Sequence, residues 1–199
     1  MNEKFDISLN FLTLSLKYLS LVKNVLKENI KQGNLHLIIS NREISEEEYD
    51  HKTRWSDFNI FPILFNFYHG LELLMKGFLI LVDNYKVKPR HDFERLLNDF
   101  KLHYPSKKEI SDILAKYLEL HHMPELLSKW LEENKMDITQ LHELLEYPFD
   151  KTFKKKINYL KLKYQQDKWL SFAKQLVNDI ETLQKGSVQL YRSLEQSNK

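Results

Sequence analysis

Residues 59–82 read Asn59-Ile-Phe-Pro-Ile-Leu-Phe-Asn-Phe-Tyr-His-Gly-Leu-Glu-Leu-Leu-Met-Lys-Gly-Phe-Leu-Ile-Leu-Val82. We expect a helix over residues 60–83 that is apolar almost all the way round, and such a helix must be buried. His69, Glu72 and Lys76 are among its few polar residues. At 100° per residue they fall within a sector of about 60°. Because a buried charge is costly unless it is paired, these three side chains are predicted to form one cluster.

The composition places the whole chain in the all-α class. With 199 residues, 42% of them hydrophobic, the chain is long enough for one sizeable core. It contains only 4 glycines and 5 prolines and no linker-like stretch, which favours long helices in a single domain over residues 1–199. It has no cysteine, which excludes disulfides and thiolate metal sites.

Hydrophobic spacing and capping residues predict the other elements. Helices are expected at residues 5–32, 45–57, 91–102, 106–120, 124–134, 137–146 and 167–196, with a break in the last one at Gly186. Residues 151–168 are dense in lysine and lack a helical period, so we expect an extended segment there, with one short strand at 159–164 as an option. The result is a helical bundle with a lysine-rich extended segment before its last helix.

Two glycines of the central helix, Gly70 and Gly77, lie seven residues apart on one stripe. Each one costs roughly 1 kcal/mol of helix propensity relative to alanine. Close approach of another helix is the compensation that we expect.

The expected cellular location and the net charge of the protein exclude few classes of function. The first ten residues lack the charged region and apolar run of a signal peptide, so we expect a cytoplasmic protein. The apolar stretch 71–82 is interrupted by Glu72 and Lys76 and is shorter than the roughly 20 residues of a membrane span, so no membrane partner is expected. The net charge of +2 is too small to predict nucleic-acid binding from the field of the whole protein.

One motif carries a family resemblance. The sequence His69-Gly-Leu-Glu-Leu-Leu-Met-Lys-Gly-Phe-Leu79, a loop, and then His91-Asp-Phe-Glu-Arg-Leu-Leu97 resembles the HEPN superfamily (higher eukaryotes and prokaryotes nucleotide-binding). The match rests on Glu72, Lys76, Gly77, Leu79, His91, Asp92 and Leu96. Residues 147–151 and 162–164 resemble the extended segment that precedes the last helix in larger bacterial members.

The resemblance implies a helical bundle that commonly dimerises and that works in phage defence, toxin–antitoxin systems or RNA metabolism. Many members are metal-independent ribonucleases with an arginine, four to six residues and then a histidine. This chain departs from that motif, since Arg95 and His103 are separated by seven residues and Arg42 and His51 by eight. We therefore assign no catalytic residue.

Two groups of residues are candidate binding sites. The predicted ligand-binding set is His69, Glu72, Lys76, His91 and Asp92. There Lys76 and His91 would meet an anionic group such as a phosphate while Glu72 orients the imidazole. The structural alternative is a helix-stabilising Glu72–Lys76 pair, with His91 as a cap or partner.

The predicted nucleic-acid-binding set is Lys154, Lys155, Lys156, Lys161 and Lys163, interleaved with aromatic residues. Lysines contact phosphates and aromatic rings stack on bases, although a solvated lysine face is the commoner outcome of such a composition. Two Glu-x-x-His pairs, Glu48 with His51 and Glu119 with His122, are poorly placed for a metal centre. We expect no metal and no cofactor.

These observations favour a nucleic-acid- or nucleotide-related binding component of a bacterial defence or toxin–antitoxin system. The alternatives are an endoribonuclease toxin with a divergent active site and a protein-interaction scaffold. The expected partners are a second copy of the chain, RNA or a nucleotide, and a cognate toxin, antitoxin or nucleotidyltransferase. Residues 188–194 and the first helix are the expected dimer interface, because a last helix of about 30 residues would be long for the domain.

Overall fold

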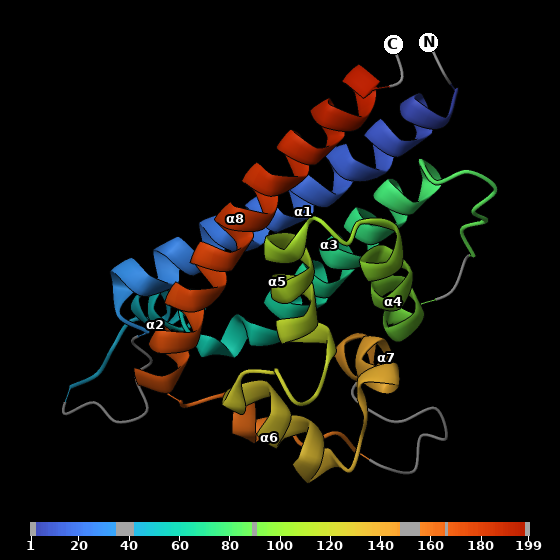
Figure 1. Cartoon of the computed structure of the whole chain (residues 1–199). Helices are drawn as coiled ribbons and strands as arrows, with labels where there is room; N and C mark the ends of the chain where they lie inside the picture. Colours follow the sequence, from blue (N-terminus) through green and yellow to red (C-terminus); the bar gives the residue numbers. More distant parts are fainter. Residues whose placement is uncertain (1–2, 35–41, 89–90, 148–155, 166, 198–199) are drawn as a thin grey trace.

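The computed structural model describes residues 3–34, 42–88, 91–147, 156–165 and 167–197 (Figure 1). Its helices are α1 (Glu3–Gln32), α2 (Glu46–Arg54), α3 (Ile60–Ile80), α4 (Phe93–His103), α5 (Lys108–Leu118), α6 (Glu125–Asn134), α7 (Leu141–Glu146) and α8 (Asp167–Ser197). Short 3₁₀ helices are η1 (Asp57–Asn59), η2 (Ile138–Gln140) and η3 (Leu160–Leu162). The described ranges contain no strand, which confirms the all-α class.

Local sequence explains where several helices begin. The Ser45 hydroxyl accepts a hydrogen bond from the Glu48 amide at 3.1 Å and caps α2, as its capping pattern predicts. Pro62 lies in the first turn of α3, where its missing amide hydrogen is tolerated. The expected cap at Ser106 is wrong, because α5 begins two residues later at Lys108 and has no side-chain cap.

The central helix α3 packs antiparallel against α1 through its two glycines. The Ser8 hydroxyl donates to the Gly77 carbonyl at 2.8 Å, and the Ser15 hydroxyl donates to the Gly70 carbonyl at 2.7 Å. A Cβ atom added at Gly77 would lie 2.8 Å from Leu12 Cδ2. The predicted close approach of a second helix is confirmed.

Helix α8 covers α1 along its length, and both chain ends lie at the same end of the bundle (Figure 1). It runs through Gly186 without a break, so the predicted interruption is wrong. Near the chain ends the Tyr191 hydroxyl donates to the Phe5 carbonyl at 3.3 Å, and Leu190 is buried. Within the segment expected at a dimer interface, Tyr191 therefore contacts the protein's own first helix, whereas Val188 is 36% exposed.

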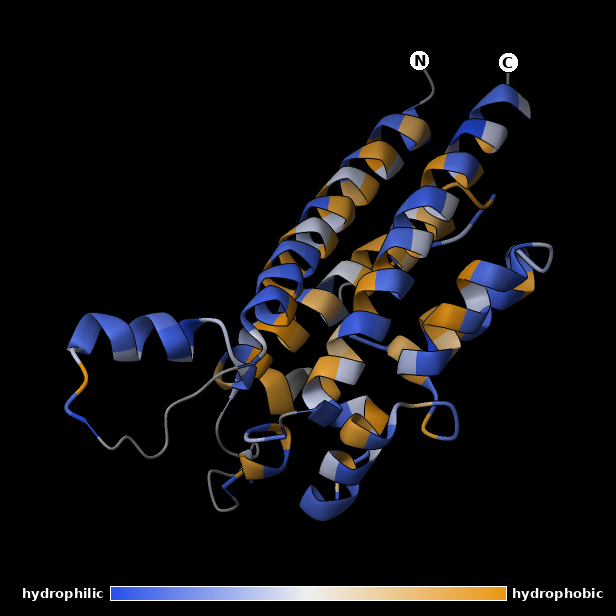
Figure 2. Cartoon of the chain, turned by 90° about the vertical axis from the view of Figure 1, so that its left-hand side faces the viewer, coloured by the Kyte–Doolittle hydropathy of each residue, from blue (hydrophilic) through white to orange (hydrophobic). Residues whose placement is uncertain are grey.

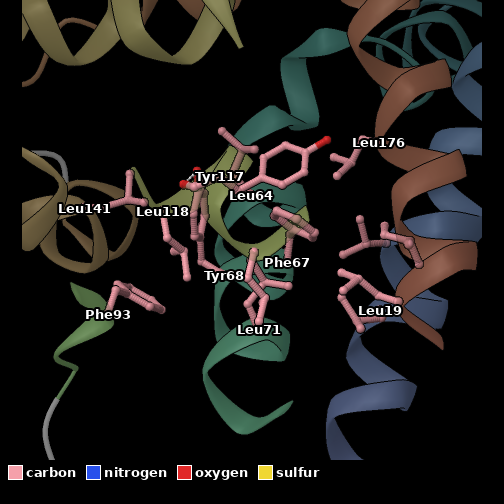
Figure 3. Close-up of a cluster of buried hydrophobic side chains, with 14 of the residues drawn as sticks. Leu19, Leu64, Phe67, Tyr68, Leu71, Phe93, Tyr117, Leu118, Leu141 and Leu176 are labelled. Carbon is pink, nitrogen blue, oxygen red and sulfur yellow. Dashed lines mark hydrogen bonds between the residues drawn. The ribbon is translucent and has the colours of Figure 1, made fainter. Parts of the chain in front are cut away.

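The core is organised around α3 (Figure 3). Its side chains Leu64, Phe67, Tyr68 and Leu71 lie among Leu19 of α1, Leu176 of α8, Phe93 of α4, Tyr117 and Leu118 of α5, and Leu141 of α7. Figure 2 colours the chain by hydropathy, and along α1 polar and apolar residues are interleaved. The cluster of buried hydrophobic side chains extends from Leu12 to Leu190.

The lysine-rich segment before α8 differs from its prediction. Residues 160–162 form the 3₁₀ helix η3, so the optional strand at 159–164 is wrong. Trp130 Nε1 donates to the Asn158 carbonyl at 2.9 Å, and the Tyr159 hydroxyl donates to the Tyr147 carbonyl at 2.8 Å. The described part of the segment is held against α6 and the end of α7 by these contacts. Residues 148–155, as well as the linker at 35–41, lie outside the described residues.

A buried polar joint connects three distant parts of the chain. Asp57 is fully buried, and its Oδ2 accepts from the Gln165 amide at 2.8 Å. The Asp57 amide donates to Asn34 Oδ1 at 2.7 Å. Asn34 follows α1 with a left-handed backbone (φ 55°), a conformation that asparagine tolerates better than most residues. The joint ties the end of α1 to the start of α3 and to the segment before α8.

By length and composition alone, two segments could cross a bilayer: Glu3–Gln32, and Asp57–Ile80, which comprises η1 and α3. In the second segment 72% of the apolar window is buried, as in the core helix of a soluble protein. The absence of a membrane partner stays a prediction.

Candidate functional site

The predicted cluster on α3 is assembled around Glu72. The Glu72 side chain is only 1% exposed. Lys76 Nζ donates to its Oε1 at 2.6 Å, and His91 Nδ1 lies 2.7 Å from its Oε2. His69 Nδ1 is 3.8 Å from Oε2, which is too far for a hydrogen bond. Four of the five predicted ligand-binding residues therefore meet at one buried carboxylate.

Helix geometry and a helix cap explain this arrangement. Residues three and four apart share a helix face, which places His69 and Lys76 beside Glu72. Asp92 caps α4, because its Oδ1 accepts from the Arg95 amide at 3.2 Å. This cap fixes the residue before it, His91, at the side of α3. The Asp92 carboxylate contacts Arg95 through this cap and through an ion pair at 3.4 Å, and its ligand-binding role stays a prediction.

The cluster keeps Glu72 ionised. Burial raises the pKa of Glu72, but contacts with His69, Lys76 and His91 outweigh that effect and lower the pKa to about 2. Lys76 is 10% exposed, whereas the side chains of His69 and His91 are 27% and 46% exposed. The imidazoles of His69 and His91 are therefore partly open to solvent, and the Glu72–Lys76 ion pair lies buried beneath them.

The carboxylate also orients the imidazole of His91. When Nδ1 donates to Glu72, Nε2 is the ring nitrogen that can accept a proton. A carboxylate behind a histidine is the arrangement that prepares a general base. His69 packs against the ring of Tyr18, with centroids 4.8 Å apart, so α1 contributes an aromatic wall next to the cluster.

Three of the five lysines in the second predicted set belong to the described residues. Lys154 and Lys155 lie outside the described residues, and Lys156 is exposed. Lys161 Nζ forms an ion pair with Glu133 at 2.8 Å. Lys163 Nζ lies over the rings of Phe58 and Phe61, 5.4 and 5.8 Å from their centroids. Lys161 and Lys163 thus have intramolecular partners, and the nucleic-acid-binding role of the five lysines stays a prediction.

Lys161 instead lines a cavity of about 550 Å³ between α5, α6, η3 and α8. Lys116, Lys129 and Lys168 line it as well, together with the apolar residues Pro124, Leu126 and Phe172. Sequence reasoning missed these three lysines, because they are spread over α5, α6 and α8 and belong to no local motif. Only the packing of the helices brings them together.

Carboxylates accompany most of these lysines. Lys116 Nζ donates to Asp179 Oδ2 at 2.6 Å, Lys129 pairs with Glu125, and Lys161 pairs with Glu133. Lys168 is exposed and forms no ion pair with a described residue. Asp179 does not line the cavity but pairs with Lys116, so four lysines meet three carboxylates, a balance of +1. The excess positive charge of the cavity therefore lies at Lys168.

Among the residues that the structure describes, no group of three or more histidine, cysteine, aspartate or glutamate side chains could hold a metal ion. Comparisons with known proteins gave no significant match to a family model, a curated protein or a solved structure. The HEPN resemblance therefore rests on the motif residues alone.

Proposed function

We propose that this protein is a nucleic-acid- or nucleotide-binding component of a bacterial defence or toxin–antitoxin system, with a HEPN-like bundle as its scaffold. The observation that carries the proposal is the lysine-lined cavity between α5, α6, η3 and α8. Its volume of about 550 Å³ falls within the range of roughly 300–1,000 Å³ that small-molecule sites occupy.

The chemistry of the lining supports a phosphate-bearing ligand. Lysine ammonium groups bind phosphate as compact point charges with three donors each. Lys129, Lys161 and Lys168 come from three elements, so they can surround a phosphate chain. Leu126 and Phe172 offer apolar surface to a base.

Fluorescence anisotropy with labelled ATP and labelled single-stranded RNA tests this proposal. We expect the triple variant Lys129→Gln/Lys161→Gln/Lys168→Gln to bind more weakly and to flatten the log–log salt dependence for RNA by about 2, since each phosphate contact in single strands contributes roughly 0.7. Lys174→Gln, an exposed change on α8 away from the cavity, is the matched control. Equal affinity and slope in the triple variant would contradict the proposal.

A second candidate is a metal-independent endoribonuclease, which the Glu72–His91 geometry favours. In that case His91 Nε2 would remove the proton from a 2′-hydroxyl, whose oxygen attacks the neighbouring phosphorus. A 2′,3′-cyclic phosphate forms, and the 5′-oxygen of the next nucleotide leaves as a hydroxyl group after it takes a proton from water. On the primary proposal, purified protein leaves RNA intact in EDTA. Cleavage that is lost in His91→Gln and kept in His103→Gln would replace the primary proposal by the nuclease.

A homodimer remains part of the proposal, and of the two surfaces expected at its interface we assign the first helix, α1. Ile7, Leu14 and Leu21 are 42%, 45% and 53% exposed. They alternate with the half-buried residues Phe11, Tyr18 and Val25. We call these six residues the α1 stripe.

The alternating spacing of three and four residues in the α1 stripe is typical of a coiled-coil contact, here over about 27 Å. Phe11 and Tyr18 border α3 at Gly77 and Gly70, so Ile7, Leu14 and Leu21 form the exposed part of the stripe. A two-fold axis would set the same stripe of two copies against each other. Because Tyr18 contacts His69, the partner copy would lie beside the Glu72 cluster.

Light scattering at tens of micromolar protein tests the dimer. Leu14→Glu/Leu21→Glu is expected to give a monomer with an unchanged circular-dichroism spectrum. Lys27→Glu, an exposed change on the opposite side of α1 where Lys27 pairs with Glu181, should leave the dimer intact. If the wild type is a monomer, the homodimer is excluded, and the α1 stripe would bind a different partner. A cognate toxin, antitoxin or nucleotidyltransferase is then the expected occupant, as the scaffold alternative requires.

A further inference from the structure

A second pocket lies between the first half of α1 and the last part of α8. Its volume is about 400 Å³. The walls are mostly apolar and come from Phe5, Leu9, Leu12, Leu16, Val188 and Tyr191. The pocket shares no residue with the lysine-lined cavity, and it lies on a different face of α1 from the α1 stripe.

One buried polar group in this pocket has no partner. Ser187 lines the pocket and is 2% exposed, and its hydroxyl makes no hydrogen bond to any described residue. Serines within helices commonly donate to the carbonyl four residues earlier, as Ser111 and Ser197 do here at 3.2 and 2.9 Å. A buried hydroxyl without a partner is destabilising. A ligand oxygen that forms a hydrogen bond with the Ser187 hydroxyl would remove this cost.

The charged residues at the rim of the pocket favour neither an anionic nor a cationic ligand. Asp6 and Glu195 lie there with Arg192, so acidic and basic groups occur side by side. An ionic ligand would meet a like charge as well as an opposite one. The apolar walls and the single inner hydroxyl therefore define the ligand better than the rim does.

We propose that this pocket binds a neutral, largely apolar small molecule with one oxygen that hydrogen-bonds to the Ser187 hydroxyl. An alcohol or a ketone with an aromatic or short aliphatic body has this chemistry. The site is independent of the proposed phosphate site, because the two involve different elements apart from α8 and residues about 12 or more apart on that helix.

The test uses the full chain and the neutral fluorophore N-phenyl-1-naphthylamine, whose emission rises in apolar sites. We expect it to bind and to be displaced by 2-phenylethanol and by propylbenzene, in which a methyl group replaces the hydroxyl. Ser187→Ala should weaken 2-phenylethanol by roughly three- to tenfold, the usual effect of one hydrogen bond, and leave propylbenzene unchanged. Ser193→Ala, whose hydroxyl lies on the same helix outside the pocket, is the matched control.

Two further measurements keep the result unambiguous. Leu9→Trp, at a half-exposed wall position, should reduce fluorophore binding by filling the pocket. Without ligand, Ser187→Ala should melt at the same temperature as the wild type or higher, because it removes an unpaired buried hydroxyl. The proposal is overturned if the fluorophore does not bind, if Leu9→Trp binds it equally, or if Ser187→Ala weakens both competitors alike.

Discussion

The hydroxyl of Ser15 donates a hydrogen bond of 2.7 Å to the backbone carbonyl of Gly70, across the contact between α1 and α3. Ser8 and Gly77 repeat this contact at 2.8 Å, seven residues away on each helix. Two small residues on each helix let the backbones approach, and the serine hydroxyls find acceptors at the short distance that results. This contact places α3, and with it Glu72, in the centre of the bundle.

Gly77→Leu should destabilise the fold by roughly 1 to 3 kcal/mol, because it overpacks this contact. Its Cβ would lie 2.8 Å from Leu12 Cδ2 and 3.2 Å from Phe11 Cβ. Urea unfolding measures the effect. Gly186→Ala is the control, since it meets only the side chain of Ile110 at 3.1 Å and gains helix propensity, so a change near zero or a small gain is expected. Unchanged stability in Gly77→Leu would contradict the packing argument.

Acid should weaken the Glu72 cluster over a defined pH range. The pKa of Glu72 is lowered from 4.5 to about 2 in the folded protein. Its contribution to the free energy of unfolding is therefore complete above pH 4.5 and is lost as the pH falls towards 2. The difference in pKa corresponds to an upper bound of about 3 kcal/mol.

Glu72→Gln should remove this pH dependence and destabilise the protein at pH 7, because Lys76 is then left almost buried without its carboxylate. Adding Lys76→Met should restore part of the stability. Urea unfolding at pH 3, 4, 5 and 7 distinguishes these variants. The same loss between pH 5 and 3 in wild type and Glu72→Gln would exclude Glu72 as its source.

Loss of the Asp57 side chain should lower the free energy of unfolding more than loss of a surface ion pair does. Asp57→Ala leaves the part-buried Gln165 amide and the Asn34 side chain without their acceptor, so we expect a loss of roughly 1 to 3 kcal/mol. Asp83→Ala, which removes an exposed ion pair with Lys4, should change the free energy by less than about 1 kcal/mol. Thermal melts of both variants test the contrast, and equal melting temperatures would refute it.

We expect Lys163 to contribute to the stability of the fold rather than to RNA binding. Lys163→Gln removes the ammonium from the faces of Phe58 and Phe61, and we expect a loss of about 0.5 to 1 kcal/mol in stability with RNA affinity unchanged. Lys156→Gln, at an exposed position, supplies the comparison. A tenfold loss of RNA affinity in Lys163→Gln alone would contradict this prediction and indicate that Lys163 contacts the nucleic acid.

Much of the secondary structure followed from local sequence. The long apolar run of α3, the cap at Ser45 and the scarcity of glycine and proline are properties of neighbouring residues, and their structural effect depends little on the rest of the fold. The Glu72 cluster was also predictable, because Lys76 lies one helical turn from Glu72. The end of α8 was not predictable, since Gly186 breaks a helix only where packing does not hold it, and here it rests against Ile110.

By itself, the sequence determined the all-α class, the burial of α3 and the close contact at Gly70 and Gly77, since periodicity and residue size act locally. Only the tertiary structure decided that Lys116, Lys129, Lys161 and Lys168 line one cavity, that Asp57 joins Asn34 to Gln165, and that Ser187 lies unpaired in an apolar pocket. The physical reason is that these groups are separated by many residues along the chain. Their distances depend on how the helices pack, which no single stretch of sequence encodes.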